Sequence, residues 1–227
     1  MAHALVFGGG GQIGAACGEA LARLGFSVLG TGRRADPVAG IHAYDPLSDA
    51  AEIPGDDPFE AVVWAQGANL NDSVIDFDVE RHRALYEANV LYVAASMNAL
   101  LTSGRVRDGA RMVVISSVWQ RIARRNKFSY MVTKAALQGL VQSAALDLAE
   151  QGIMVNAVLP GALDTPMTRA NLTVEQIDRL AGMTPFNRLP AIADVANLTA
   201  FLCSEQNSSI TGQFVSVDLG FENAKLV

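Results

Sequence analysis

The sequence has few cysteines, few histidines and no cluster of either. Its two cysteines, Cys17 and Cys203, lie far apart, and the three histidines, His3, His42 and His82, are scattered. Neither set has the spacing of metal ligands, so we expect no metal site. A metal-free, cytoplasmic protein with reduced thiols is the simplest prediction.

Long apolar runs are also lacking, since none approaches the roughly 18 residues of a membrane span. The apolar run at residues 4–7 gives way to glycines and is too short for a signal peptide. Acidic residues outnumber basic ones, 23 to 17, and the net charge of −6 argues against a nucleic-acid partner. Half of the 227 residues are hydrophobic and 18% are charged, so we expect one globular domain over residues 1–227, without a membrane or nucleic-acid partner.

Short apolar segments alternate with segments of helical periodicity along the chain. The expected strands cover residues 4–7, 26–31, 61–65, 111–116, 154–159 and 213–217. The expected helices cover residues 13–24, 79–103, 127–151, 174–180 and 191–203. This alternation predicts an α/β fold, a single Rossmann-type doubly wound parallel sheet with helices on both faces. The pattern weakens near the C-terminal third, where residues 162–190 are predicted to form a substrate lid.

A glycine-rich turn, GGGGQIG at residues 8–14, joins the first expected strand to the first helix. Gly8 would make the tight turn, Gly11 or a neighbour would let the backbone approach a pyrophosphate, and Gly14 would let helix pack on strand. The helix N-terminus offers free N–H groups to phosphates. We therefore predict that Gly8, Gly11, Gln12, Ile13 and Gly14 bind a dinucleotide; a merely flexible turn is the alternative.

The second expected strand ends in two arginines, Arg33 and Arg34, with no carboxylate before Asp36. An acid at this position would bind the ribose 2′-hydroxyl of NAD, whereas guanidinium groups pair with a 2′-phosphate. The sequence therefore favours NADP over NAD. A pair of solvated loop arginines is the alternative.

A serine, a tyrosine and a lysine supply the elements of carbonyl chemistry. Tyr130 and Lys134 are four residues apart in an expected helix and so share a face. A nearby ammonium favours the phenolate of a phenol whose ordinary pKa is near 10, which would move Tyr130 toward acid/base use. Ser117, at the end of a buried strand, can donate a hydrogen bond to a substrate carbonyl. Ser116 is the alternative if the register differs by one residue, and helix-face and strand-cap roles are the ordinary alternatives for these side chains.

In this order and at these distances, the motifs resemble those of the short-chain dehydrogenase/reductase family, and of its 3-oxoacyl-carrier-protein reductases, over essentially the whole chain. Further matches are Asp45, Gly67, Asn89 and the segments NAVLPG at residues 156–161 and ITGQ at residues 210–213. The resemblance implies that Asp45 bonds the adenine amine and that Leu163 and Thr165 hold the nicotinamide carboxamide. It also places Pro46, Ala65 and Gly67 along the cofactor. Lys134 would bond the nicotinamide ribose, and Asn89 would hold a water that links Lys134 to solvent.

Three departures from the family pattern stand out. Phe7 occupies the position of a threonine before the glycine turn, and Gln12 that of a glycine. The Asn-Asn-Ala-Gly motif reads WAQG at residues 64–67, which removes amides that brace the central strands. The closing Asp-Gly-Gly reads DLG at residues 218–220.

The segment between Ser117 and Tyr130 carries a cluster of cations, Arg121, Arg124, Arg125 and Lys127, in an otherwise acidic chain. The resemblance implies that this segment borders the substrate mouth. A solvated charge run or a subunit contact is one interpretation. The other is an anionic substrate: a carboxylate, a phosphate, or an acyl chain on a phosphopantetheine carrier.

The predicted function is that of an NADP(H)-dependent oxidoreductase that interconverts a ketone and a secondary alcohol, with an anionic or carrier-linked substrate suggested by the cations. Asn89, Ser117, Tyr130 and Lys134 are the predicted catalytic residues. The alternatives are a sugar, polyol or cyclic-alcohol dehydrogenase, and a non-catalytic nucleotide-binding sensor of the same fold. The resemblance also implies a homotetramer or homodimer built on the two long helices.

Overall fold

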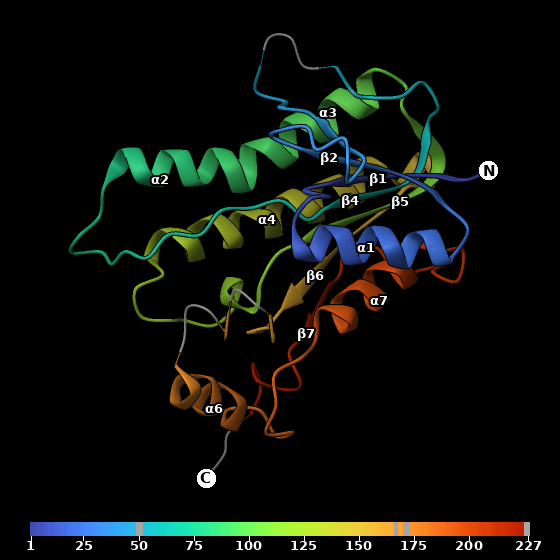
Figure 1. Ribbon diagram of the computed structural model, residues 1–227. Helices are drawn as coiled ribbons and strands as arrows, with labels where there is room; N and C mark the ends of the chain where they lie inside the picture. Colours follow the sequence, from blue (N-terminus) through green and yellow to red (C-terminus); the bar gives the residue numbers. More distant parts are fainter. Residues whose placement is uncertain (49–51, 166–167, 170–172, 225–227) are drawn as a thin grey trace.

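A seven-stranded parallel sheet runs through the centre of the computed structural model, which describes residues 1–48, 52–165, 168–169 and 173–224 (Figure 1). The strands lie in the order β3-β2-β1-β4-β5-β6-β7. Their bounds are β1 His3–Phe7, β2 Ser27–Gly32, β3 Ile41–Ala43, β4 Phe59–Trp64, β5 Val106–Ile115, β6 Met154–Pro160 and β7 Phe214–Val217. The chain winds outward from β1 to β3 and then returns to β4 on the other side of β1, so the strand order reverses there. This switch point is where ligands bind in doubly wound sheets.

Helices cover both faces of the sheet, which confirms the predicted architecture (Figure 1). One layer holds α1 (Gln12–Arg23) and α7 (Ile192–Cys203), which pack against each other. The opposite layer holds α2 (Val79–Tyr86), α3 (Tyr92–Thr102) and α4 (Phe128–Asp147). The short helix α6 (Val174–Gly182) lies apart from both layers.

The central strands carry runs of consecutive apolar residues because both of their faces are covered. In β1, Leu5 and Phe7 belong to the core beneath α3 and α4, whereas Ala4 and Val6 belong to the core beneath α1 and α7. All four side chains are at most 1% exposed. The two cores thus fix β1 in the middle of the sheet, directly ahead of the glycine turn.

The structure differs from the sequence-based prediction at several elements. Strand β3 was not expected, because only Ile41 of its three residues is buried. Strand β5 begins at Val106, before the apolar run that predicted a start at residue 111. The helix expected over residues 79–103 is divided into α2 and α3 by a π-helical turn at Glu87–Leu91. A single extra residue in the turn shifts the helix face, and such turns are frequent at functional sites.

None of the helices in the described part of the chain is both long and apolar enough to span a membrane. Within the same residues no three His, Cys, Asp or Glu side chains gather into a group that could hold a metal. Cys17 and Cys203 are both free and buried.

Candidate active site

The glycine turn folds tightly against the ends of β2 and β4. Gly8 has a φ of +76°, which favours glycine, and its N–H donates to the carbonyl of Thr31 at 2.8 Å. A Cβ on Gly8 would lie 2.6 Å from the backbone nitrogen of Gln66, and one on Gly14 would lie 2.1 Å from the carbonyl oxygen of Gly8. Neither position can hold a side chain without moving backbone. The turn therefore fits the predicted roles of Gly8 and Gly14.

A groove of about 240 Å³ opens beside this turn at the switch point of the sheet. Its lining includes five residues predicted to contact the cofactor, namely Gly8, Gly11, Arg33, Ala65 and Gly67. The groove thus joins the first helix N-terminus, the end of β2 and the end of β4, the three elements that hold a dinucleotide in such folds.

Two arginines, and no free carboxylate, follow the end of β2. Arg33 lines the groove, whereas exposed Arg34 is outside the lining. Neither arginine makes an ion pair within the residues that the structure describes. Asp36 is committed to its own turn, because its Oδ1 accepts from the N–H groups of Val38 and Ala39, both at 3.1 Å. The carboxylate that would compete for a ribose hydroxyl is therefore engaged elsewhere.

Other predicted cofactor residues lie around the groove without lining it. Gln12 is the exposed first residue of α1. Asp45 follows β3, and its Oδ1 accepts from the N–H of Leu47 at 3.1 Å. Neither Asp45 nor the adjoining Pro46 is part of the groove lining. Their contact with the adenine stays a prediction.

A second cavity of about 240 Å³ contains the predicted reaction centre. Ser117 and Tyr130 line it, together with Ile13 and Leu163. The Ser117 side chain is near enough to Tyr130 to lower the pKa of its phenol. Thr165 lies beyond this lining, and its Oγ1 accepts from the N–H of Thr168 at 2.9 Å. The structure thus brings both hydroxyls together where a carbonyl oxygen could contact them.

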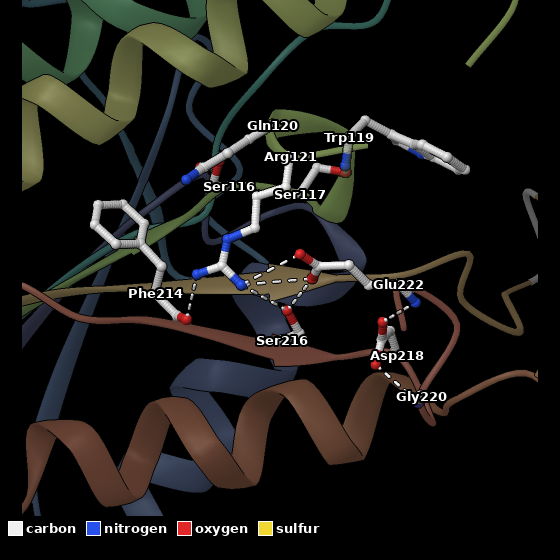
Figure 2. A network of polar contacts seen from close by, with 10 residues as sticks. All are labelled: Ser116, Ser117, Trp119, Gln120, Arg121, Phe214, Ser216, Asp218, Gly220 and Glu222. Atoms are coloured by element: carbon white, nitrogen blue, oxygen red, sulfur yellow. Dashed lines mark hydrogen bonds and ion pairs between the residues drawn. The ribbon is translucent and has the colours of Figure 1, made fainter. Parts of the chain in front are cut away.

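Ser116 and Ser117 both line this cavity but have different hydrogen-bond partners. Ser116 donates to the side-chain oxygen of Gln120 at 2.6 Å and is committed to that contact (Figure 2). Ser117 precedes a short 3₁₀ turn and accepts from the N–H of Trp119 at 3.3 Å. Its side chain is the one that lowers the pKa of Tyr130. These partners favour Ser117 over Ser116, and its catalytic role stays a prediction.

The π-helical turn places Asn89 between the loop after β4 and helix α4. Its Oδ1 accepts from the N–H of Ala68 at 2.7 Å, and its Nδ2 donates to the hydroxyl of Thr133 at 3.0 Å. A Cβ on Gly67 would lie 3.2 Å from Asn89 Oδ1 and 3.8 Å from Lys134 Nζ. The structure therefore brings Gly67, Asn89 and Lys134 together, as the resemblance implies. In the described part of the chain, both the oxygen and the nitrogen of the Asn89 amide are hydrogen-bonded to protein groups.

Folding removes the side chains of Lys134 and Tyr130 from much of their contact with solvent. Nζ of Lys134 lies 5.7 Å from the centre of the Tyr130 ring and donates to the carbonyl of Ile115 at 3.2 Å. Burial lowers the pKa of Lys134 to about 8. Burial raises the pKa of Tyr130, and the nearby Ser117 side chain and the charge of Arg124 lower it in part. The expected fall in the phenol pKa is therefore wrong for the protein alone: burial outweighs the neighbouring charges, and the phenol holds its proton at neutral pH.

The predicted cation cluster is divided by the fold. Figure 2 shows that Arg121 points away from the reaction centre toward β7 and the segment after it. Its Nη2 donates to the carbonyl of Phe214 at 2.9 Å, and its Nη1 lies 3.4 Å from Oε1 of Glu222. Ser216 donates to the same Glu222 carboxylate at 2.6 Å. Arg121 therefore ties the segment after Ser117 to β7 and does not belong to a substrate-facing cluster.

An outer cavity of about 600 Å³ adjoins the reaction centre through Trp119 and Arg124, which line both spaces. Leu180 and Met183 from the predicted lid segment form another part of its wall. Phe221 packs edge-to-face on Trp119, with ring centres 5.5 Å apart. Residues 166–167 and 170–172 of the predicted lid lie outside the described residues.

Two polar side chains at the site were missed by the sequence reasoning. Gln66 lines the cofactor groove, and both polar atoms of its amide are buried without a hydrogen-bond partner. Lys127 was counted only as one of the loop cations, but it lines the reaction centre. In the sequence, the feature that could have indicated Gln66 is its departure from the Asn-Asn-Ala-Gly pattern. The feature that could have indicated Lys127 is its position three residues before Tyr130, nearly one helical turn away.

Comparison with known proteins identifies the family. Residues 59–222 match the family model described as "Enoyl-(Acyl carrier protein) reductase". The chain is 31% identical to the "Uncharacterized oxidoreductase YmfI" of Bacillus subtilis, with 96% of this chain and 98% of the relative covered. It is 28% identical to the 3-oxoacyl-[acyl-carrier-protein] reductase FabG of Escherichia coli, with 96% of each covered.

The solved structures agree with this result. A short-chain dehydrogenase/reductase from Serratia marcescens superimposes with a TM-score of 0.88 at 25% identity, covering 97% of this chain and 98% of that one. The seven-stranded sheet, the glycine turn and the Ser117, Tyr130 and Lys134 arrangement are thus accompanied by sequence similarity over nearly the whole length. The chain belongs to the short-chain dehydrogenase/reductase family of oxidoreductases.

Proposed function

We propose that the protein is an NADP(H)-dependent oxidoreductase that interconverts a ketone and a secondary alcohol at Ser117, Tyr130 and Lys134. The observation that carries this proposal is that Ser117 and Tyr130 line one cavity beside the glycine turn, with the buried Lys134 next to the Tyr130 ring. A sensor that binds nucleotide without turnover has no need of a buried lysine beneath that pair. The complete set therefore supports an enzyme.

The chain's own residues would handle the oxygen and the proton. Ser117 donates a hydrogen bond to the carbonyl oxygen, where negative charge develops. The protonated phenol of Tyr130 gives its proton to that oxygen, and the ammonium of Lys134 stabilises the phenolate that remains. Asn89 fixes the loop at Gly67 against the same lysine through its contacts with Ala68 and Thr133. The bound nicotinamide would supply or accept the hydride.

NADP is the proposed cofactor because Arg33 lines the groove and Asp36 is engaged with its own turn. Gly8, Gly11 and Gly14 would allow the backbone to approach the pyrophosphate, and the N-terminus of α1 would bind its charge. The unpartnered amide of Gln66 gives the groove a further hydrogen-bonding group.

The proposal also covers the domain organisation, the substrate lid and the location of the protein. Residues 1–227 would act as one domain, and the 162–190 segment would close over the substrate through Leu180 and Met183. The free thiols of Cys17 and Cys203 suit the reducing cytoplasm.

Helix α4 exposes Val132 and Leu146, at 41% and 77%, which favours a homodimer or homotetramer through this helix. Sedimentation velocity would measure that state.

The test is a screen of the purified protein with NADPH and NADH against 3-oxoacyl thioesters, keto-sugars, cyclic ketones and short oxo acids. Loss of cofactor absorbance would report turnover, and a secondary alcohol should accumulate in equal amount. NADPH should be consumed faster than NADH with every substrate that reacts. If the protein binds NADPH and reduces no ketone in the screen, a non-catalytic nucleotide-binding sensor becomes the better interpretation than an enzyme.

A further inference from the structure

Lys127 is a buried cation at the reaction centre. The residue is only 7% exposed, and its Nζ lies 5.4 Å from the centre of the Tyr130 ring. Nζ donates to the amide oxygens of Asn69 and Asn71, at 2.5 Å and 2.6 Å. Two neutral acceptors therefore orient the ammonium and use two of its three N–H donors. One donor remains.

Within the described residues, no carboxylate lies within ion-pair distance of Lys127. The carboxylate of Asp72 acts on it from beyond that distance and accepts from the N–H of Ser129 at 2.9 Å and from the hydroxyl of the same residue. Burial and the charge of Arg124 lower the pKa of Lys127, and Asp72 opposes them in part. A buried charge without a counterion in contact is costly even when neutral groups accept its hydrogen bonds, and a bound anion would relieve that cost.

A second cation faces the same cavity. Arg124 lines the reaction centre with Lys127, and its guanidinium lies over the Trp119 ring at 5.2 Å. Arg124 makes no ion pair in the described part of the chain either. Two unpaired cations thus line the cavity that contains the hydroxyls of Ser117 and Tyr130.

From this arrangement we infer that the substrate is an oxo acid, or the matching hydroxy acid, whose carboxylate binds Lys127 and Arg124 while its carbonyl contacts Ser117 and Tyr130. The inference rests on the proposed function and adds the substrate class. Because Nζ of Lys127 lies beside the Tyr130 ring, the carboxylate must be only a few bonds from the reacting carbon. The phosphate of a carrier-linked acyl chain is many bonds away from its ketone and does not meet this condition.

The experiment compares short oxo acids with their methyl esters, for example acetoacetate with methyl acetoacetate. Along the series, the number of bonds between the ketone and the carboxyl group increases. For at least one pair, kcat/KM for the acid should exceed that for the ester about tenfold to a hundredfold, the range of one charge-assisted hydrogen bond. Lys127→Gln should remove most of this preference by lowering kcat/KM for the acid much more than for the ester. Lys127→Arg should restore part of it. Arg125→Gln removes an adjacent charge that lies outside the lining of the reaction centre, and it should keep the preference.

A binding measurement separates this inference from the proposed function. Trp119 lies at the site, so intrinsic fluorescence can follow the oxo acid binding to the protein saturated with NADP⁺, where no turnover occurs. Tighter binding of acid than ester, lost in Lys127→Gln, supports the inference even if no ketone is reduced. If neutral ketones react and no acid is preferred over its ester, the inference is overturned and the proposed function stands. The comparison in the unmodified protein decides the matter even if the Lys127 variants do not fold.

Discussion

The ring of Phe7 stacks on the indole of Trp64, with ring centres 5.5 Å apart and an interplanar angle of 18°. These residues end adjacent strands, β1 and β4, and are paired in the sheet register. Both occupy positions where the family pattern has polar residues, and here the two departures form one apolar contact. Trp64 keeps a polar link as well, because its Nε1 donates to Ser96 at 2.8 Å. The bracing of the central strands is thus replaced by aromatic packing and one indole hydrogen bond.

Phe7→Ala should therefore lower the free energy of unfolding by about 3–5 kcal/mol, the usual cost of removing a fully buried ring. Phe7 is 0% exposed and also contacts the rings of Tyr44 and Tyr92. Urea unfolding would measure the change. Phe186→Ala is the matched control, because that ring is 63% exposed and its loss should cost within about 0.5 kcal/mol. Similar losses at both positions would contradict a bracing role for the aromatic pair.

The Phe7–Trp64 contact also shows where sequence reasoning stopped. Alternating apolar strands and helices fixed the sheet, and the spacing of Tyr130 and Lys134 placed both on α4, since these features follow from local periodicity. The loss of the bracing amides was visible in the sequence, but their replacement was not, because it depends on two strands lying side by side. The same applies to Arg121, whose partner Glu222 comes from a distant part of the chain. The π-helical turn at Asn89 left no periodic signal.

Cofactor choice should depend on Arg33. Arg33→Ala should weaken NADPH binding by about 1–3 kcal/mol, since it removes a charge-assisted contact with the 2′-phosphate, and NADH binding should barely change. Titration of both cofactors by intrinsic fluorescence would show this. Arg34→Ala is the control, because Arg34 does not line the groove, and its effect on NADPH should be smaller. Equal affinities for NADPH and NADH in the unmodified protein would refute the NADP assignment.

Turnover should depend on the Tyr130 hydroxyl. Tyr130→Phe removes the proton donor and keeps the ring, so kcat for ketone reduction should fall by about 10²–10⁴, while NADPH affinity stays nearly the same. Lys134→Ala should impair both, because it removes the charge beneath the phenol and the proposed contact with the nicotinamide ribose. Steady-state rates and cofactor titrations on the same preparations would separate the two effects. A Tyr130→Phe variant that retains more than about a tenth of kcat would show that another group donates the proton.

The pH dependence of reduction should report Lys134. Burial lowers the pKa of this lysine to about 8, so its ammonium is present below that pH and is lost as the pH rises through it. The Tyr130 phenol, whose pKa burial raises, stays protonated over the same range. For a neutral ketone, kcat/KM should therefore be constant below pH 8 and decrease above it, because the phenolate formed by proton donation loses its cationic partner. In Lys134→Arg the guanidinium remains charged, so any remaining activity should decrease only at higher pH. NADPH affinity measured across the same range serves as the control. A profile for the unmodified protein that stays constant well above pH 8 would mean that the ammonium of Lys134 is not required for proton donation.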